Sequence, residues 1–319
     1  MYRALVIGCG NIGAVYDFEN EHVHTHSKAF FLNPAFEFDV FDVDTNKAKT
    51  VFEKYGCGIA ENIDAKTLAK YDCVSICTPT AQHYTILQKA MEAKVQLIIC
   101  EKPVADHADD IDALIEMYNE SESKILVNYM RRFQPAYQQI KGVITELQTT
   151  EKLTNINIRY QRGFVNNCSH AFDIIEYFTT SEFQPENIHI SNADYSDFQN
   201  DPTLSISAFW NGCNVSIHGL SDVLFSHFEI DFYYQHYKLA VRESGNQIAL
   251  YRAKKGEGFL LPLQIISVTD NALHNYMENV ITTAEHLLSG RSADDNFIQS
   301  ALMNKRILTY IRQHGKTGN

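Results

Sequence analysis

Short apolar runs alternate with amphipathic helical patterns over the first 127 residues of the chain. The runs that predict buried strands lie at residues 3–7, 36–41, 73–77, 95–100 and 124–128. One helical pattern covers residues 47–55, where apolar residues recur on one face and Gly56 follows as a helix end. Strands that are apolar throughout and alternate with helices predict a doubly wound, mostly parallel sheet covered on both faces.

The pattern changes near residue 128, beyond which strand patterns predominate. Candidate strands lie at residues 156–160, 188–193, 204–209, 213–219, 228–233, 237–241 and 247–251. The pairs Asn211-Gly212 and Gly245-Asn246 favour tight turns, so we expect an antiparallel meander. Two helical patterns close the chain. We therefore predict an α/β domain at residues 1–127 and an α+β domain with a large, mostly antiparallel open sheet at residues 128–319.

Composition narrows the classes of function. The chain has 319 residues, and its 27 Lys and Arg against 39 Asp and Glu give a net charge of −12, which disfavours nucleic-acid binding. No apolar run approaches the ~20 residues of a membrane span, and the N-terminus lacks a signal-peptide pattern. The seven cysteines form no CxxC pair. We expect a reduced, cytoplasmic protein with no membrane partner and no bound metal.

A glycine motif follows the first predicted strand and opens a helical pattern. It consists of Gly8-Cys9-Gly10-Asn11-Ile12-Gly13. The first glycine permits a tight turn, the second lets a pyrophosphate approach the backbone, and the third lets helix and strand pack closely. In this context the motif predicts a dinucleotide-binding Rossmann domain.

Asp42 follows the second predicted strand, where a carboxylate can accept hydrogen bonds from the adenosine ribose hydroxyls. It would repel a 2′-phosphate, and no arginine follows it, so the sequence favours NAD over NADP. Asp42 lies 29 residues after Gly13 (42 − 13 = 29), more than the usual ~20. The excess predicts an insertion around residues 17–25.

Three alternate histidines, His22, His24 and His26, belong to this insertion. Their spacing would place three imidazoles on one side of a strand, as in a metal site. The surrounding segment is polar and has weak strand signals, so we expect a solvated loop instead.

Further motifs follow in the order typical of one family. They are Val74-Ser75-Ile76-Cys77-Thr78-Pro79-Thr80 with His83, then Cys100-Glu101-Lys102-Pro103, then Asn128-Tyr129-Met130-Arg131-Arg132-Phe133, and then Ser169-His170-Ala171-Phe172-Asp173. Over nearly its whole length the chain resembles the Gfo/Idh/MocA oxidoreductases, NAD(P)-dependent enzymes that act mostly on sugars, polyols and sugar derivatives. The resemblance implies a nicotinamide cofactor and a carbohydrate-like substrate.

The resemblance assigns roles to residues of the first domain. It implies that Thr78, Pro79, His83, Glu101 and Arg131 lie on the cofactor side, and that Lys102 contacts the substrate hydroxyl beside the nicotinamide. Two alternatives stay open. The segment around Thr78 is also an ordinary strand-to-helix turn. Arg131, with its neighbour, either binds an anionic or hydroxyl-rich substrate or pairs with acidic residues across a domain interface.

In the second domain the resemblance makes His170 the acid–base candidate, because an imidazole can take a hydroxyl proton as hydride leaves the same carbon. Asp173, three residues later on the same helix face, is expected to contact substrate or orient a neighbour. The chain departs from the family at Asn166, where many members have Asp, and at Cys168, where they have glycine. Asn166 cannot take a proton, which puts turnover in question.

These observations favour an NAD-dependent dehydrogenase or ketone reductase acting on a sugar, polyol or sugar-nucleotide, with catalytic residues Lys102, Asn166, His170 and Asp173. One alternative is a catalytically silent protein that senses NAD or sugars. Another is an enzyme that oxidises and re-reduces its substrate with bound NAD in a net non-redox reaction. The family commonly forms dimers or tetramers, so we expect a homo-oligomer.

Overall fold

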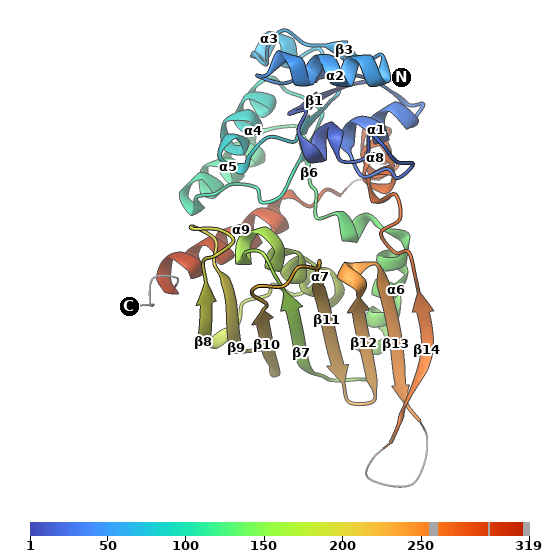
Figure 1. Cartoon of the computed structure of the whole chain (residues 1–319), viewed down its shortest axis with the longest axis vertical. Helices are drawn as coiled ribbons and strands as arrows, with labels where there is room; N and C mark the ends of the chain where they lie inside the picture. The colour runs from blue at the N-terminus through green and yellow to red at the C-terminus, as the bar shows by residue number, and fades with distance from the viewer. Residues whose placement is uncertain (255–260, 293, 315–319) are drawn as a thin grey trace. The chain divides into compact units, whose positions relative to one another are not determined.

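The computed structural model describes residues 1–254, 261–292 and 294–314. It divides into two compact units, the first made of residues 1–133 and 275–305 and the second of residues 134–274 and 306–319 (Figure 1). Residues 275–305 thus belong to the first unit, so the units differ in membership from the domains 1–127 and 128–319 that the sequence suggested. Within the described ranges, no helix combines the length and apolar character that crossing a bilayer demands.

The first unit contains the predicted parallel sheet, with the strand order β3-β2-β1-β4-β5-β6 and every neighbouring pair parallel. The strands are β1 (Tyr2–Ile7), β2 (Phe36–Phe41), β3 (Gly58–Ile59), β4 (Cys73–Ile76), β5 (Leu97–Cys100) and β6 (Lys124–Val127). The order reverses at β1 and β4, so the carboxyl ends of these two strands form the crevice where such sheets bind ligands.

Helices flank this sheet. They are α1 (His26–Leu32), α2 (Thr45–Tyr55), α3 (Ala65–Leu68), α4 (His83–Glu92), α5 (Ala108–Glu120), α8 (Tyr276–Leu288) and the first part of α9 (Phe297–His314), with short turns η1 (Asn11–Val15), η2 (Thr80–Gln82) and η3 (Met130–Phe133). α2 ends at Gly56 in the left-handed conformation, as predicted. α8 joins the first unit because its apolar face, including Met277, Val280 and Ile281, is part of the same core as Val6 and Val40.

The second unit contains an eight-stranded sheet with the order β14-β13-β12-β11-β7-β10-β9-β8. The strands are β7 (Leu153–Tyr160), β8 (Glu186–Asp194), β9 (Thr203–Trp210), β10 (Cys213–Gly219), β11 (Phe228–Tyr234), β12 (Tyr237–Arg242), β13 (Gln247–Ala253) and β14 (Leu263–Thr269). The sheet is mostly antiparallel, as predicted, but it is not a simple meander. β7 lies between β11 and β10 and runs parallel to β10, because its apolar residues Ile156 and Ile158 are fully buried there.

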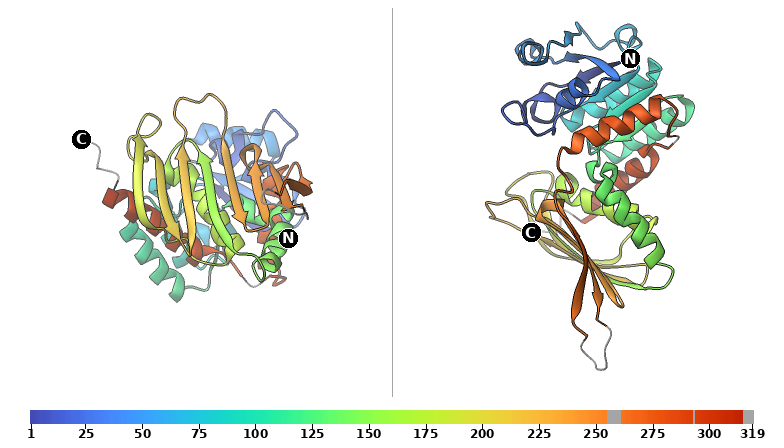
Figure 2. Two further views of the ribbon diagram at one scale, coloured as in Figure 1. Left: turned by 90° about the horizontal axis from the view of Figure 1, so that it is seen from below. Right: turned by 90° about the vertical axis from the view of Figure 1, so that its right-hand side faces the viewer.

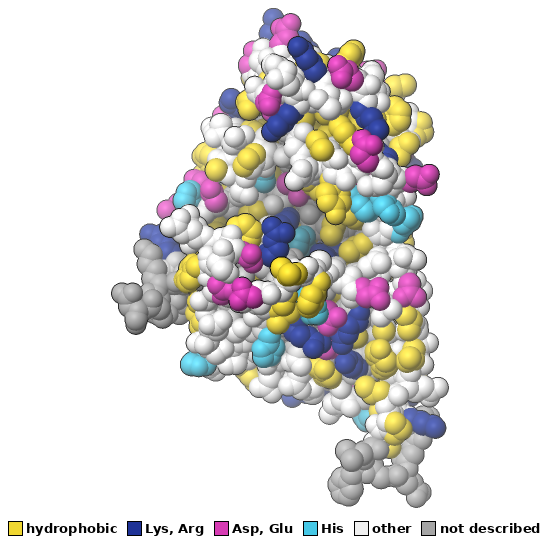
Figure 3. Space-filling model, viewed as in Figure 1, with side chains coloured by type: hydrophobic (Ala, Val, Ile, Leu, Met, Phe, Trp, Pro, Cys, Tyr) yellow, Lys and Arg dark blue, Asp and Glu magenta, His cyan; other side chains and the backbone are white. Residues whose placement is uncertain are grey.

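Helices α6 (Pro135–Leu147) and α7 (Ser169–Thr179), with the turn η4 (Phe164–Cys168), cover one face of this sheet (Figure 2). Phe178 of α7 packs 5.8 Å from Phe232 of β11, measured between ring centroids. The opposite face carries a network of ion pairs over β7, β11 and β12, where charged side chains gather in Figure 3. Asp231 accepts from Lys238 at 3.1 Å and from Arg242 at 2.5 Å.

Candidate cofactor and active site

The glycine loop follows β1 and is shaped by close approaches of the backbone. Gly8 has a φ of +100°, and a Cβ there would lie 2.8 Å from the carbonyl carbon of Cys77. A Cβ on Gly13 would lie 1.9 Å from the carbonyl oxygen of Gly8, so both positions require glycine. A Cβ on Gly10 would meet no described atom within 4 Å. Gly10 therefore faces open space, which fits the approach of a pyrophosphate.

The helical segment after the loop is the short π-helical turn η1, which begins at Asn11, includes Ile12 and ends at Val15. The backbone N–H groups of Ala14 and Val15 donate to the carbonyl oxygen of Gly10 at 2.9 and 3.1 Å. The insertion follows, and α1 begins only at residue 26. Buried Asp17 anchors the insertion by accepting from the backbone N–H of His24 at 2.6 Å.

Asp42 lies at the carboxyl end of β2, beside the glycine loop. Its Oδ2 accepts from the backbone N–H of Cys9 at 2.8 Å, and its Oδ1 accepts from the backbone N–H of Asp44 at 2.8 Å. Both oxygens are thus fixed in place by main-chain donors, which holds the carboxylate at the edge where a ribose would lie.

His83 connects the two loops that follow β4 and β5. Its Nε2 lies 2.9 Å from the carbonyl oxygen of Thr78, and its Nδ1 lies 2.8 Å from the carbonyl oxygen of Pro103. Pro79 stands between Thr78 and the turn η2. The Oγ1 of Thr78 is buried and has no hydrogen-bond partner among the described residues. A buried polar atom of this kind, just beyond the carboxyl end of β4, fits a bound dinucleotide.

Glu101 is the centre of a buried hydrogen-bond network in the first unit. Its Oε1 accepts from Asn128 Nδ2 at 2.6 Å and lies 2.9 Å from His26 Nε2. The other ring nitrogen of His26 lies 2.6 Å from Ser75 Oγ. Lys102 follows Glu101 and is partly exposed, and the Lys102–Pro103 peptide bond is cis.

The expectation of a solvated loop was wrong for His26. His26 is the first residue of α1 and is 0% exposed. Its imidazole bonds to Ser75 on β4 and to Glu101, which follows β5. Its partners are 49 and 75 residues away, so no local sequence signal could have identified it. His22 and His24 stack on each other with ring centroids 5.1 Å apart. Among the described residues, no group of His, Cys, Asp and Glu is arranged to hold a metal ion.

The two arginines that follow β6 lie on η3 and are buried. Arg131 is 5% exposed and Arg132 is 8% exposed. Arg132 Nη1 donates to Gln299 Oε1 at 3.2 Å. Both arginines belong to the first unit, but their roles toward a substrate stay a prediction.

The second unit contains the other predicted catalytic residues. Asn166 lies on η4, where its Nδ2 donates to the carbonyl oxygen of Arg162 at 3.1 Å and its backbone N–H donates to Asp201 at 2.8 Å. His170 and Asp173 lie one turn apart at the start of α7 and are 9% and 1% exposed.

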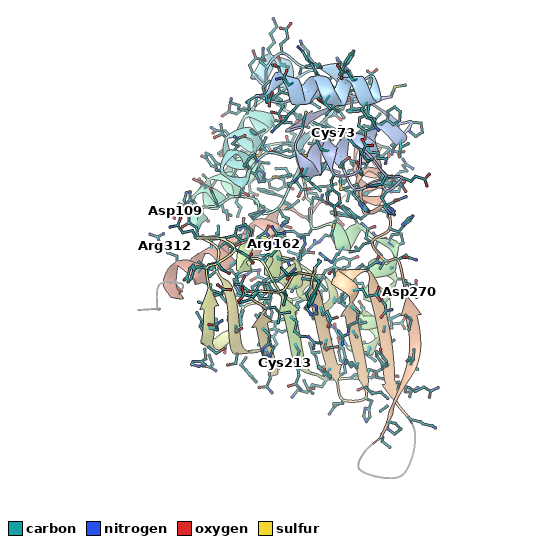
Figure 4. The ribbon with its side chains drawn as sticks, in the orientation of Figure 1. Cys73, Asp109, Arg162, Cys213, Asp270 and Arg312 are labelled. Atoms are coloured by element: carbon teal, nitrogen blue, oxygen red, sulfur yellow. The ribbon has the colours of Figure 1, made fainter. Side chains whose placement is uncertain are left out.

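A hollow of about 500 Å³ opens beside Asn166. It is lined by Gln161, Arg162, Asn166, Asn167 and residues 223–226. Arg162, labelled in Figure 4, lies just beyond the end of β7. The lining offers amides and a guanidinium, which are groups that hydrogen-bond to hydroxyls and anions.

Comparisons with known proteins agree with this geometry. Residues 2–129 match the family model described as "Oxidoreductase family, NAD-binding Rossmann fold". UDP-N-acetylglucosamine 3-dehydrogenase of Acidithiobacillus ferrooxidans is 32% identical over 139 residues, which are 44% of this chain and 40% of that protein. Inositol 2-dehydrogenase of Rhizobium meliloti is 30% identical over 143 residues, with the same coverage. The aligned part spans about two fifths of these curated relatives.

Solved structures show that the whole fold is shared. The Acidithiobacillus enzyme superposes with a TM-score of 0.75 at 18% identity, over 98% of this chain and 96% of that one. A super-repressor mutant of Gal80p from Saccharomyces cerevisiae superposes with a TM-score of 0.76 at 14% identity, over 100% of this chain and 97% of that one. At these identities the likeness establishes the fold alone.

Proposed function

From the match of residues 2–129 to the Gfo/Idh/MocA family model, we propose that the chain is an NAD-dependent dehydrogenase or ketoreductase of this family. Its substrate is a sugar, a polyol or a sugar-nucleotide. The observation that carries the proposal is the convergence of four features at one sheet edge: the open Gly10, the anchored Asp42, the Thr78 hydroxyl, which has no hydrogen-bond partner within the described ranges, and the Lys102 loop. The curated relatives act on a sugar-nucleotide and an inositol, according to their names.

The residues of the chain supply binding, orientation and proton transfer. The backbone at Gly10 and the N–H groups of η1 would hold the pyrophosphate, and Asp42 would accept from the adenosine ribose. When bound, the nicotinamide cofactor supplies hydride transfer. Lys102 donates a hydrogen bond to the reacting oxygen and polarises it. His170 takes or returns the proton of that hydroxyl, and Asn166 holds the substrate by hydrogen bonds alone.

Substitution of the two proton-handling residues tests the proposal. A positioned acid–base group typically contributes about 10²–10⁴-fold, so His170→Ala should lower turnover by that factor and leave NAD affinity nearly unchanged. Lys102→Ala should lower turnover similarly, with a larger loss of substrate binding. Turnover is followed by nicotinamide absorbance with a panel of sugars, polyols and sugar-nucleotides. His107→Gln, an exposed histidine, is the matched control. A parental rate in His170→Ala would exclude it as the acid–base group.

Asn166 favours a second candidate function, that of a protein that senses NAD or a sugar and catalyses no reaction. Its amide is already bonded to the carbonyl oxygen of Arg162, and it cannot support the histidine as a carboxylate would. A catalytically silent protein that senses NAD or a sugar would bind both ligands without turnover. Asn166→Asp should preserve or increase the rate if the chain is a dehydrogenase. If it abolishes activity, the site works through Asn, and the net non-redox reaction becomes the leading alternative.

A further inference from the structure

The network around His26 has a role that the proposed chemistry does not use. Its members are His26 of α1, Ser75 of β4, Glu101 after β5 and Asn128 after β6. Glu101, which bonds to both His26 and Asn128, directly precedes Lys102. His26 is 0% exposed and the Glu101 side chain is 12% exposed. A carboxylate so deeply buried is stable only with a charged or multiply hydrogen-bonded partner.

The electrostatics agree with this contact geometry. Burial alone would lower the pKa of His26, but the Cys77 sulfur and the Glu101 carboxylate outweigh burial and raise this pKa to about 10. Burial raises the pKa of Glu101, but the hydrogen bond and charge of His26, the amide of Asn128 and the charge of Lys102 lower it overall. On α8, burial and the Glu101 carboxylate both raise the pKa of Tyr276. Both pKa shifts favour an imidazolium that faces a carboxylate.

The pair also bears on Lys102. Glu101 is covalently joined to Lys102, and the two charges interact. On the other side of Lys102, the carbonyl oxygen of Pro103 is bonded to His83. A buried histidine thus holds the residue on each side of the lysine: His26 bonds to the side chain of Glu101, and His83 bonds to the carbonyl oxygen of Pro103.

We propose that His26 is a positioning residue: as an imidazolium paired with Glu101, it fixes the backbone that presents Lys102 and sets the charge around that lysine. The catalytic consequence rests on the proposed function, but the pairing and the effect on Lys102 do not. Removal of the positive charge of His26 leaves the negative charge of Glu101 less neutralised. The more exposed negative charge should favour the protonated form of Lys102 and raise its pKa.

The first experiment requires no activity. In the full chain labelled with ¹⁵N-histidine, both ring nitrogens of His26 should remain protonated at pH 8. His26→Gln identifies the signals. Because the pKa of His26 is raised from 6.5 to about 10, its contribution to stability should be complete below pH 6.5 and lost as pH rises through 10. A His26 that titrates near 6.5 would overturn the proposal.

The second experiment separates positioning from simple structural support. In His26→Gln, the pKa of ¹³C-methylated Lys102 should rise relative to the parent, and kcat should fall at least tenfold with the Kd of NAD within about threefold. Glu101→Gln should lower kcat similarly, and the double variant should be no worse than the worse single variant. His107→Gln should change none of these values. Additive losses, or an unchanged Lys102 pKa, would contradict the assignment. If no substrate turns over, the Lys102 and histidine measurements still decide it.

Discussion

At the scale of single residues, we expect Asp42 to favour NAD over NADP. Its two oxygens are held by the backbone N–H groups of Cys9 and Asp44, so the carboxylate cannot easily turn away from a 2′-phosphate. We predict that NAD(H) binds at least tenfold more tightly than NADP(H), a difference of about 1.4 kcal/mol. Titration calorimetry with both cofactors measures this difference. Equal affinities would remove the role assigned to Asp42.

At the scale of elements, the sequence predicts five of the six strands of the first unit to within about two residues, because buried parallel strands are rich in apolar residues. The two-residue strand β3 was not predicted. The second unit was less predictable. The place of β7 beside β10 depends on pairing between segments 59 residues apart, as in Asn155 and Asn214. In β14, which we did not predict, the pairing register shifts opposite Leu250 and Tyr251 and breaks the alternation. His26 was missed for a similar reason, because its partners lie on other elements.

The glycine loop yields a prediction at this scale, since its glycines are required for different reasons. Gly13→Ala should destabilise the fold by about 1–3 kcal/mol, because its Cβ would overlap the backbone of Gly8. Gly10→Ala should fold normally, since Gly10 has a φ of −80° and its Cβ would meet no described atom within 4 Å, but it should bind NAD at least tenfold more weakly. Thermal unfolding and calorimetry distinguish the two effects. Tight NAD binding by Gly10→Ala would show that the pyrophosphate does not approach there.

At the scale of the whole molecule, the face of the eight-stranded sheet opposite α6 and α7 combines charge with exposed apolar surface. Register places Leu263, Ile265 and Val268 of β14 on the same face as Tyr251 and Lys238 of the neighbouring strands. The three apolar side chains of β14 are 45–57% exposed. Several exposed apolar residues beside an ion-pair network are typical of a surface that another protein covers.

We therefore predict that the chain forms a homodimer or homotetramer through this face. Ile265 is 57% exposed, so Ile265→Lys should leave folding within about 0.5 kcal/mol of the parent while shifting the assembly toward monomer. Light scattering at micromolar concentration measures the mass of each protein, and circular dichroism confirms that the variant is folded. The matched control is Leu32→Lys on α1, which is 50% exposed in the first unit and should not change the mass. A parent that is strictly monomeric at this concentration, or an Ile265→Lys variant with the parental mass, would exclude β14 from the interface.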